Sequence, residues 1–307
     1  MPGAGRAITG VVIAVAVALA LFLALHGQGE AHPPAAAGAG PDGIGGTSQA
    51  TGTGSGAAAP ASHANPLSAA ASYVASRSGS VLAAVYDVRT GQSWRLGDGP
   101  AQPEASVVKL DILETLLARQ GGTGLTPDDK SLSKTMIEDS DNGAATSLWH
   151  EAGGAAGVGS YNDSAGLSKT TPSTCVTCAG FAWPGWGLTT TVPQDQLSLL
   201  KQLVLPGVRP LLSDAQRSYV LSLMGNVAPD QRWGVSGGVP SGVRVALKNG
   251  WLPLNDANTD WQINSVGWVS GDGRDYLMAV FSTGNPTEQY GIDTINALSA
   301  RVWTAMR

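Results

Sequence analysis

The chain has 307 residues, of which 43% are apolar, so it is long enough and apolar enough to bury a sizeable core. Its 18 basic and 23 acidic side chains give a formal net charge of −5. A nucleic-acid-binding surface needs a concentration of Lys and Arg, so this balance argues against a nucleic-acid partner.

The first segment of the chain is expected to direct export. Arg6 precedes the stretch from Ile8 to Leu25, which carries no charged residue. Its length lies between that of a long signal-peptide core and that of a short membrane-spanning helix. We therefore interpret residues 1–26 as a signal peptide or an N-terminal membrane anchor. The rest of the chain is expected outside the cytoplasm, membrane-anchored or secreted.

Residues 27–65 have the composition of a linker. They consist mainly of Gly, Ala, Ser, Thr and Pro, with almost nothing to bury. Such a segment cannot offset its own ordering entropy and is expected to stay flexible. The folded domain is therefore predicted over residues 66–307, as a monomer.

The hydrophobic periodicity predicts strands at both ends of this domain and helices in its middle. A helix over 67–78 is followed by a hairpin with strands 81–88 and 93–96. Helices are expected over 106–119, 127–138, 143–151, 194–204 and 214–224. Strands over 243–248, 261–270 and 276–283 and a helix over 288–306 complete the chain. This order predicts an α+β fold whose antiparallel sheet is assembled from both chain ends, with a ligand cleft between the sheet and a helical lobe.

A serine activated by a lysine is the chemistry that the sequence favours. The domain holds one histidine, His150, whereas Ser-x-x-Lys places an ammonium beside a hydroxyl on one helix face. If that face is buried, desolvation favours the neutral amine, which can act as a base.

Three copies of Ser-x-x-Lys occur, and their surroundings distinguish them. The copies begin at Ser106, Ser131 and Ser198. The helix from Ser106 is apolar nearly all round and is expected to be buried. The second copy lies among charged residues, so its Lys134 should be solvated, and the third should lie on a polar outer face. These contexts select Ser106 and Lys109.

Two further motifs follow in order. Ser140-Asp141-Asn142 lies between two predicted helices, and Lys248-Asn249-Gly250 is expected to end a strand. Together with Ser106-x-x-Lys109, the set resembles the signature of class A beta-lactamases and penicillin-binding proteins. The resemblance extends from about Leu67 to Arg307 and implies a beta-lactamase/transpeptidase-like fold.

The resemblance implies a role for each matching residue. Ser106 would be the acylated nucleophile and Lys109 its base. Ser140 would pass a proton to the leaving nitrogen.

Five further residues would bind the substrate. Asn142 would bind the substrate amide and hold the catalytic lysine, and Lys248 would attract the substrate carboxylate. The backbone N–H groups of the nucleophile and of Trp251 would form the oxyanion hole. Asn249 stands where the family usually has Thr or Ser, and its amide is expected to donate in place of the hydroxyl. Gly250 would leave the strand open to the substrate backbone.

One departure from the family bears on turnover. Class A beta-lactamases deacylate with a loop glutamate that activates water, but no glutamate occurs between Glu151 and Glu288. Asp163 is the nearest carboxylate to that loop, and it is more readily interpreted as a solvated residue. Slow or absent lactam turnover is therefore predicted.

Two pairs of residues have structural alternatives. Cys175 and Cys178 are expected to form a disulfide, because a close pair can persist in this form outside the cytosol. A redox role would need a thiol near the start of a helix, and a zinc site would need more ligands. Trp183 and Trp186 have two alternative roles: they are expected either to line the cleft or to pack a loop onto the helical lobe.

The resulting hypothesis is acyl transfer on a beta-lactam or a peptidoglycan-derived peptide, with no cofactor and no metal. Two alternatives stay open: a binding or scaffold protein that has lost turnover, and a small-ester hydrolase that uses the same serine.

Overall fold

The computed structural model describes residues 64–121, 124–178, 185–205 and 210–307. The predicted export segment, nearly all of the predicted linker and Trp183 lie outside these ranges. Within the described ranges, no helix combines the length and the hydropathy needed to cross a bilayer.

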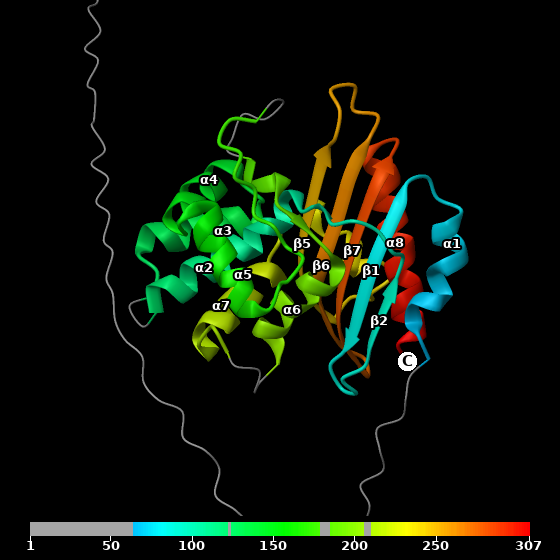
Figure 1. The fold of residues 1–307 in the computed structure, drawn as a ribbon. Coiled ribbons are helices and arrows are strands. Elements are labelled where there is room, and N and C mark those ends of the chain that lie inside the picture. Colours follow the sequence, from blue (N-terminus) through cyan, green and yellow to red (C-terminus); the bar gives the residue numbers. More distant parts are fainter. Residues whose placement is uncertain (1–63, 122–123, 179–184, 206–209) are drawn as a thin grey trace, which may run out of the picture. The chain divides into compact units, whose positions relative to one another are not determined.

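A five-stranded antiparallel sheet forms the centre of the fold (Figure 1). Its strands are β1 (Ser80–Asp87), β2 (Ser93–Leu96), β5 (Arg244–Pro253), β6 (Trp261–Gly271) and β7 (Arg274–Asn285). The spatial order is β2-β1-β7-β6-β5, so the N-terminal hairpin pairs with the last strand of the chain. This arrangement confirms that the sheet is assembled from both ends of the domain.

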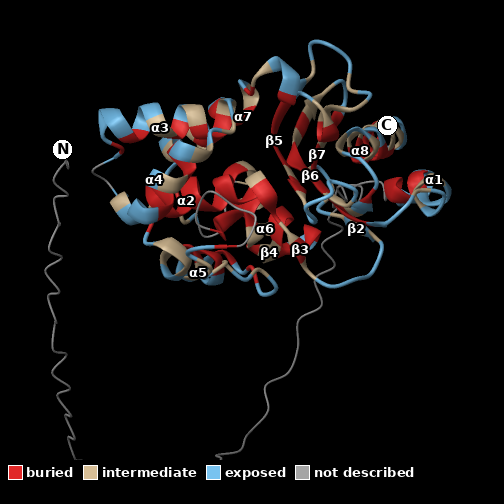
Figure 2. Ribbon diagram, turned by 90° about the horizontal axis from the view of Figure 1, so that it is seen from above, coloured by how far each residue is buried: buried red, intermediate tan, exposed pale blue. Residues whose placement is uncertain are grey.

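Helices cover both faces of the sheet (Figures 1 and 2). The helical lobe contains α2 (Lys109–Gln120), α3 (Pro127–Glu138), α4 (Asn142–Glu151), α5 (Gly154–Ala165), α6 (Pro193–Val204) and α7 (Asp214–Gly225). The opposite face carries η1 (Pro66–Ala70), α1 (Ala71–Ala75) and α8 (Glu288–Ala305). Each face has its own apolar core, because alternate residues of a strand point to opposite faces.

Short elements connect these layers. The 3₁₀ turns are η2 (Ala105–Val108), η4 (Gly185–Leu188), η5 (Pro229–Gln231) and η6 (Gly234–Ser236), and β3 (Gln102–Pro103) pairs with β4 (Thr190–Thr191). The predicted helix from Ser106 therefore begins as a 3₁₀ turn and becomes α-helical at Lys109.

Two differences from the sequence-based prediction have a clear physical reason. Helix α5 was not predicted, because its glycines lower helix propensity, but Val158, Tyr161 and Ala165 pack into the core and stabilise it. The strand predicted to end at Lys248 continues to Pro253. As an edge strand, β5 tolerates a proline there.

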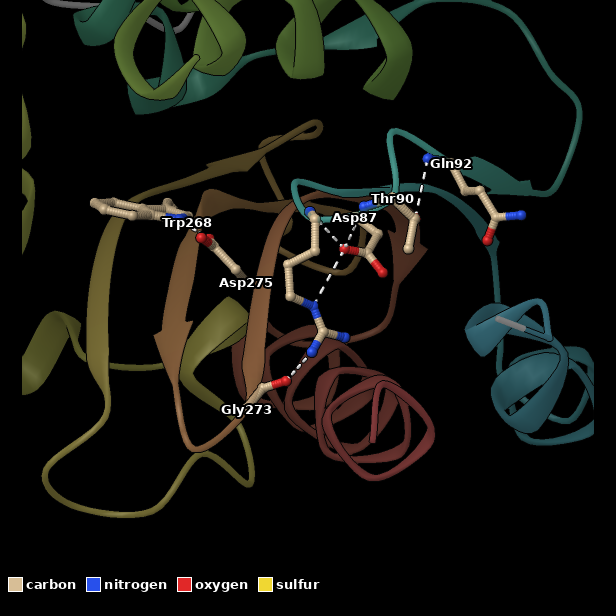
Figure 3. Close-up of polar contacts among 7 residues, drawn as sticks. Asp87, Thr90, Gln92, Trp268, Gly273 and Asp275 are labelled. Carbon is tan, nitrogen blue, oxygen red and sulfur yellow. Dashed lines mark hydrogen bonds and ion pairs between the residues drawn. The ribbon is translucent and has the colours of Figure 1, made fainter. Parts of the chain in front are cut away.

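The turns at one end of the sheet are joined by polar contacts (Figure 3). Asp87, at the end of β1, accepts hydrogen bonds from the backbone N–H groups of Arg89 and Thr90. The Arg89 guanidinium reaches across to the carbonyl of Gly273 in the β6–β7 turn. Trp268 of β6 donates to Asp275 of β7 over 2.6 Å. The Arg89–Gly273 contact joins the two hairpins, and none of these residues belongs to the predicted site.

Candidate active site

A cavity of about 560 Å³ lies between the helical lobe and the β5–β6 side of the sheet. Its lining includes four of the predicted site residues, Ser106, Ser140, Asn142 and Trp251. The remaining lining residues come from the turns beside Ser106 and from the β5–β6 hairpin: Ala105, Trp186, Gly187, Leu188, Leu252, Pro253, Leu254, Asn255, Asp256, Asn258 and Trp261. The predicted cleft between lobe and sheet is therefore present.

Ser106 lies on a tight turn that precedes a buried helix. Ala105, directly before it, has φ +50°, a conformation that a residue with a Cβ seldom adopts. Ser106 is half-buried and faces the cavity, while the three residues after it are buried. Strain of this kind is often found where a reactive side chain must be held in one position.

The loop between α3 and α4 brings Ser140 and Asn142 to the same place. Ser140 has φ +58°, and Asp141 caps α4 by accepting a hydrogen bond from the Ala144 N–H over 2.6 Å. The cap fixes the start of α4, so Asn142 enters the site from the first turn of that helix.

Two lysines meet at Ser140. Lys109 Nζ donates to Ser140 O over 2.6 Å, to Ser140 Oγ over 3.1 Å and to Asn142 Oδ1 over 2.8 Å. Lys248 Nζ donates to Ser140 Oγ over 2.9 Å and to Asn249 O over 3.0 Å. The three sequence motifs are thereby brought together in a single hydrogen-bonded network.

Burial lowers the pKa of both lysines. Desolvation lowers the pKa of Lys109 to about 7, although the carboxylate of Asp141 opposes this shift. Desolvation also lowers the pKa of Lys248 well below its usual value, and the positive charge of Lys109 adds to the shift. A neutral amine is therefore accessible near neutral pH in this network.

The other two Ser-x-x-Lys copies lie in different surroundings. The Lys134 side chain is 64% exposed and pairs with Glu138 over 3.6 Å, in line with the solvated position expected for it. Lys201 is half-buried, with its Nζ 4.0 Å from the centre of the Tyr86 ring. Its helix face is thus less polar than predicted. Lys109, by contrast, has no exposed surface.

The expectation for Asn249 is wrong. Residues 248 and 249 point to opposite faces of β5, and the Asn249 side chain is buried on the face away from the lobe. Its amide donates to the carbonyls of Gln231 over 2.7 Å and Trp233 over 3.2 Å. Both amide hydrogens are therefore used within the protein and do not reach the cavity.

Gly250 is required for a different reason from the one expected. A Cβ built at this position would lie 2.7 Å from Glu104 O and 2.8 Å from Ser106 N. The missing side chain allows β5 to pack against the turn that carries Ser106. The contact is within the protein, where substrate had been expected.

Three buried carboxyl groups behind the nucleophile were missed by the sequence analysis. Glu104, Asp111 and Glu114 have no exposed surface. Desolvation raises the pKa of Asp111 to about 7 and that of both glutamates well above the usual value. The signal was present in the sequence, because two acidic residues interrupt the otherwise apolar stretch after Lys109.

None of these carboxyl groups lines the cavity, and neither does Asp163. Glu104 Oε1 accepts a hydrogen bond from Gln196 over 3.3 Å, and Glu114 accepts one from Tyr161 over 2.7 Å. Asp163 is exposed on α5, as expected for a solvated residue. Among the described residues, no group of three or more His, Cys, Asp or Glu is arranged to hold a metal ion.

The cysteine pair lies behind one wall of the cavity. Cys175 and Cys178 are joined by a disulfide, and Gly185 donates its N–H to Cys175 O over 2.8 Å. Gly185 begins the turn that carries Trp186, which is buried, lines the cavity and donates to Thr146 over 3.2 Å. Trp186 thus both packs the loop onto the lobe and contributes to the cleft.

Solved beta-lactamase structures share this fold. The TLA-1 extended-spectrum beta-lactamase superimposes with a TM-score of 0.65 at 17% identity, over 78% of this chain and 97% of that one. A beta-lactamase from Xanthomonas campestris gives a TM-score of 0.66 at 17% identity, over 79% and 99% of the two chains. A mutant of PBP-A in an acyl-enzyme complex with penicillin G gives 0.64 at 20% identity, over 78% and 95%.

Sequence comparison extends to a mycobacterial protein. "Putative lipoprotein LppW" of Mycobacterium tuberculosis is 31% identical over 209 residues, which are 65% of this chain and 62% of LppW. The chain thus matches somewhat less than two thirds of that relative's length. Residues 120–306 match the beta-lactamase enzyme family, beginning after the Ser106–Lys109 motif. The chain has a class A beta-lactamase-like fold and belongs to the beta-lactamase enzyme family.

Proposed function

We propose that the chain is an acyl-transfer serine hydrolase that forms an ester between Ser106 Oγ and the carbonyl carbon of a beta-lactam or a cell-wall peptide amide. The observation that carries this proposal is that Lys109 and Lys248 both donate to Ser140, in the cavity that Ser106 lines. The penicillin G complex of PBP-A, which has a similar fold, supports a lactam as the first substrate to test.

Lys109 is proposed as the base of the acylation step. Because burial holds its pKa at about 7, a substantial fraction is neutral near neutral pH. The neutral amine takes the Ser106 proton as Oγ attacks the carbonyl carbon. Backbone N–H groups of Ser106 and Trp251 stabilise the developing oxyanion, and one such donor typically contributes about 3 kcal/mol.

Ser140 is proposed to complete the step. When the carbon–nitrogen bond breaks, the leaving nitrogen takes the Ser140 hydroxyl proton, and Ser140 recovers a proton from the protonated Lys109. Lys248 lies 2.9 Å from the same hydroxyl, where it orients Ser140 and favours proton release. Asn142 holds Lys109 through Oδ1, which leaves its amide N–H₂ group for the substrate.

Deacylation is proposed to be slow. It requires a base that activates water on the ester carbonyl, and the loop that supplies a glutamate in class A enzymes has none here. Glu104 is the carboxyl nearest to Ser106 in sequence, but it is buried and does not line the cavity, and burial raises its pKa, which disfavours the carboxylate form that a base requires.

Export is part of the proposal. The relative LppW is named a putative lipoprotein, and this name supports a membrane-associated chain. We propose that residues 1–26 export or anchor the chain and that residues 27–65 link them to a monomeric catalytic domain.

Intact-mass spectrometry after exposure to benzylpenicillin tests the proposal. We expect a persistent adduct on the wild type and on Ser131→Ala, and none on Ser106→Ala. Rapid multiple turnover that depends on Ser106 would contradict slow deacylation. Absence of any adduct at high concentration would contradict the proposed acylation and favour a scaffold protein.

A further inference from the structure

The β5–β6 hairpin lines the cavity with apolar and aromatic residues at its base, two of which (Trp251 and Trp261) also pack against the core on the other face of the sheet, and with polar residues at its tip. Trp251, Leu252 and Pro253 of β5 continue into Leu254, whose side chain is 38% exposed, and Trp261 begins β6. Trp186 and Leu188 line the cavity from η4. Apolar surface that faces a cavity is buried on binding by an apolar or aromatic group of a ligand.

Lys248, the residue expected to attract a carboxylate, is engaged within the protein. It has no exposed surface and does not line the cavity. Two of its three possible hydrogen bonds go to Ser140 Oγ and Asn249 O. Because no Lys248 surface is open to the cavity, an anion bound there does not contact this side chain directly.

The neighbouring position in the family motif is also closed. Both amide hydrogens of Asn249 are held by the backbone of the segment Gln231–Trp233. The Trp233 ring then packs edge-on against Trp251, with the ring centres 6.1 Å apart. Aromatic and backbone groups therefore cover β5 on the face opposite to Lys248.

The charge that remains at the cavity is negative. Among the described lining residues, the ionisable side chain is Asp256, on the exposed loop of the hairpin. Arg232 lies outside the lining, and its guanidinium donates to Gly225 O over 3.0 Å. A carboxylate that enters the cavity would approach Asp256, and the like charges would repel each other.

From these contacts we infer that the site selects an uncharged acyl donor with an apolar or aromatic group, and that a carboxylate on the substrate contributes little to its recognition. The inference rests on the proposed acylation of Ser106. In this arrangement Lys248 acts on Ser140, and the β5–β6 hairpin wall provides most of the binding surface.

Benzylpenicillin and its methyl ester are a matched pair that tests the charge preference. They share the lactam and the phenylacetyl group and differ in the carboxylate. A hydrogen bond to a charged group would make the free acid about tenfold or more faster in acylating Ser106. We expect the methyl ester to react at least as fast as the free acid, measured as the second-order rate of adduct formation by intact mass.

Variants identify the groups responsible. Asp256→Asn should raise the rate of the free acid relative to the ester by about twofold to fivefold, as for an exposed charge pair. Asp163→Asn, an exposed acid outside the cavity, should leave that ratio unchanged. A methyl ester that reacts tenfold more slowly than the free acid on the wild type would overturn the inference. If Arg232→Ala then abolished that rate difference, Arg232 would be identified as the residue that binds the substrate carboxylate.

The apolar preference has its own comparison. Replacing the phenylacetyl group of the methyl ester by acetyl should slow acylation by about tenfold, because less apolar surface is buried. Trp261→Ala should narrow this difference, and equal rates for the two esters on the wild type would contradict the inference. If neither the esters nor the free acid labels Ser106, the proposed function itself fails. If the free acid labels Ser106 and the esters do not, the proposed function holds and only this inference fails.

Discussion

Gly250 and Ser106 approach so closely that a Cβ at position 250 would lie 2.8 Å from the backbone nitrogen of Ser106. That nitrogen belongs to the proposed oxyanion hole, so the spacing between β5 and the nucleophile turn bears directly on catalysis.

Gly250→Ala should therefore impair acylation more than folding. The added methyl group must push β5 away from the turn, at a typical cost of about 1–3 kcal/mol for overpacking. We expect the acylation rate to fall by about tenfold to a hundredfold while the far-UV circular dichroism stays native, since one displaced oxyanion donor has an effect of this order. Gly225→Ala is the matched control, because nothing lies within 4 Å of a Cβ there. An unchanged rate in Gly250→Ala would show that the contact does not position the nucleophile.

Lys109→Met should abolish most of the acylation activity. Loss of a general base typically costs about a hundredfold to ten-thousandfold. Lys134→Met removes a lysine from a second Ser-x-x-Lys copy, but on an exposed surface, and should react like the wild type. Stopped-flow or intact-mass kinetics with a penicillin would measure both. Equal rates in the two variants would remove Lys109 from the mechanism.

The acylation rate should increase with pH through about 7 and then level off. The base is the neutral form of Lys109, whose pKa burial lowers to about 7, so its population increases as the pH increases through that value. Asp141→Asn removes the carboxylate that opposes this shift, and should move the midpoint to lower pH. A pH-independent rate from 5 to 9 in the wild type would contradict the assignment.

Between pH 5 and 7, the buried carboxyl groups should make the fold less stable as the pH rises, before the buried lysines, whose pKa values are lowered, act in the opposite direction at higher pH. Burial raises the pKa of Glu104, Asp111 and Glu114, so the folded state binds protons that the unfolded state has released. The contribution is complete below the unfolded pKa near 4 and is lost as the pH rises towards and through the folded value, about 7 for Asp111. Each such group changes the free energy of unfolding by at most about 1.4 kcal/mol per pH unit.

Asp111→Asn tests this linkage. The facing groups on α5 and α6 include Tyr161, Asn162, Asp195 and Gln196, none of which is a cation. Removing one titrating carboxyl should flatten the dependence of the melting temperature on pH between 5 and 7, whereas Asp163→Asn should preserve the wild-type slope. A wild-type melting temperature that increases over this range would mean that the carboxyl groups are ionised in the folded protein.

The double variant Cys175→Ala/Cys178→Ala should affect acylation more than stability. The disulfide closes a very short loop, whose removal typically costs about 2 kcal/mol or less. The carbonyl of Cys175 anchors Gly185, and the disulfide holds that carbonyl in place. Loss of the disulfide should therefore displace the turn that holds Trp186 in the cavity wall. Thermal melting and acylation rates would be compared, after a thiol count has verified the bond in the wild type. A normal acylation rate together with a large loss of stability would indicate a purely structural role.

The sequence alone predicted most of the order of the elements and selected the residues proposed for the site. The β-branched and aromatic residues of β1, β6 and β7 and the apolar helix after Ser106 are local patterns, and the structure contains these elements. The same local pattern distinguished Lys109, which is buried, from the exposed Lys134. Helix α5 escaped prediction because its stability comes from packing by residues distant in sequence.

The tertiary structure decided which way the motif residues point and what surrounds them. Asn249 follows Lys248 directly, but the pleat of β5 sends the two side chains to opposite faces, and the carbonyls that hold Asn249 come from a segment 16 to 18 residues earlier. The buried carboxyl groups come from α2 (Asp111 and Glu114) and from Glu104, which precedes the turn that carries Ser106. The aromatic residues that line the cavity come from two strands and from the turn that carries Trp186. Spacing along the chain specifies such motifs, whereas their charge states and ligand preference depend on the desolvation and contacts that only the packed fold creates.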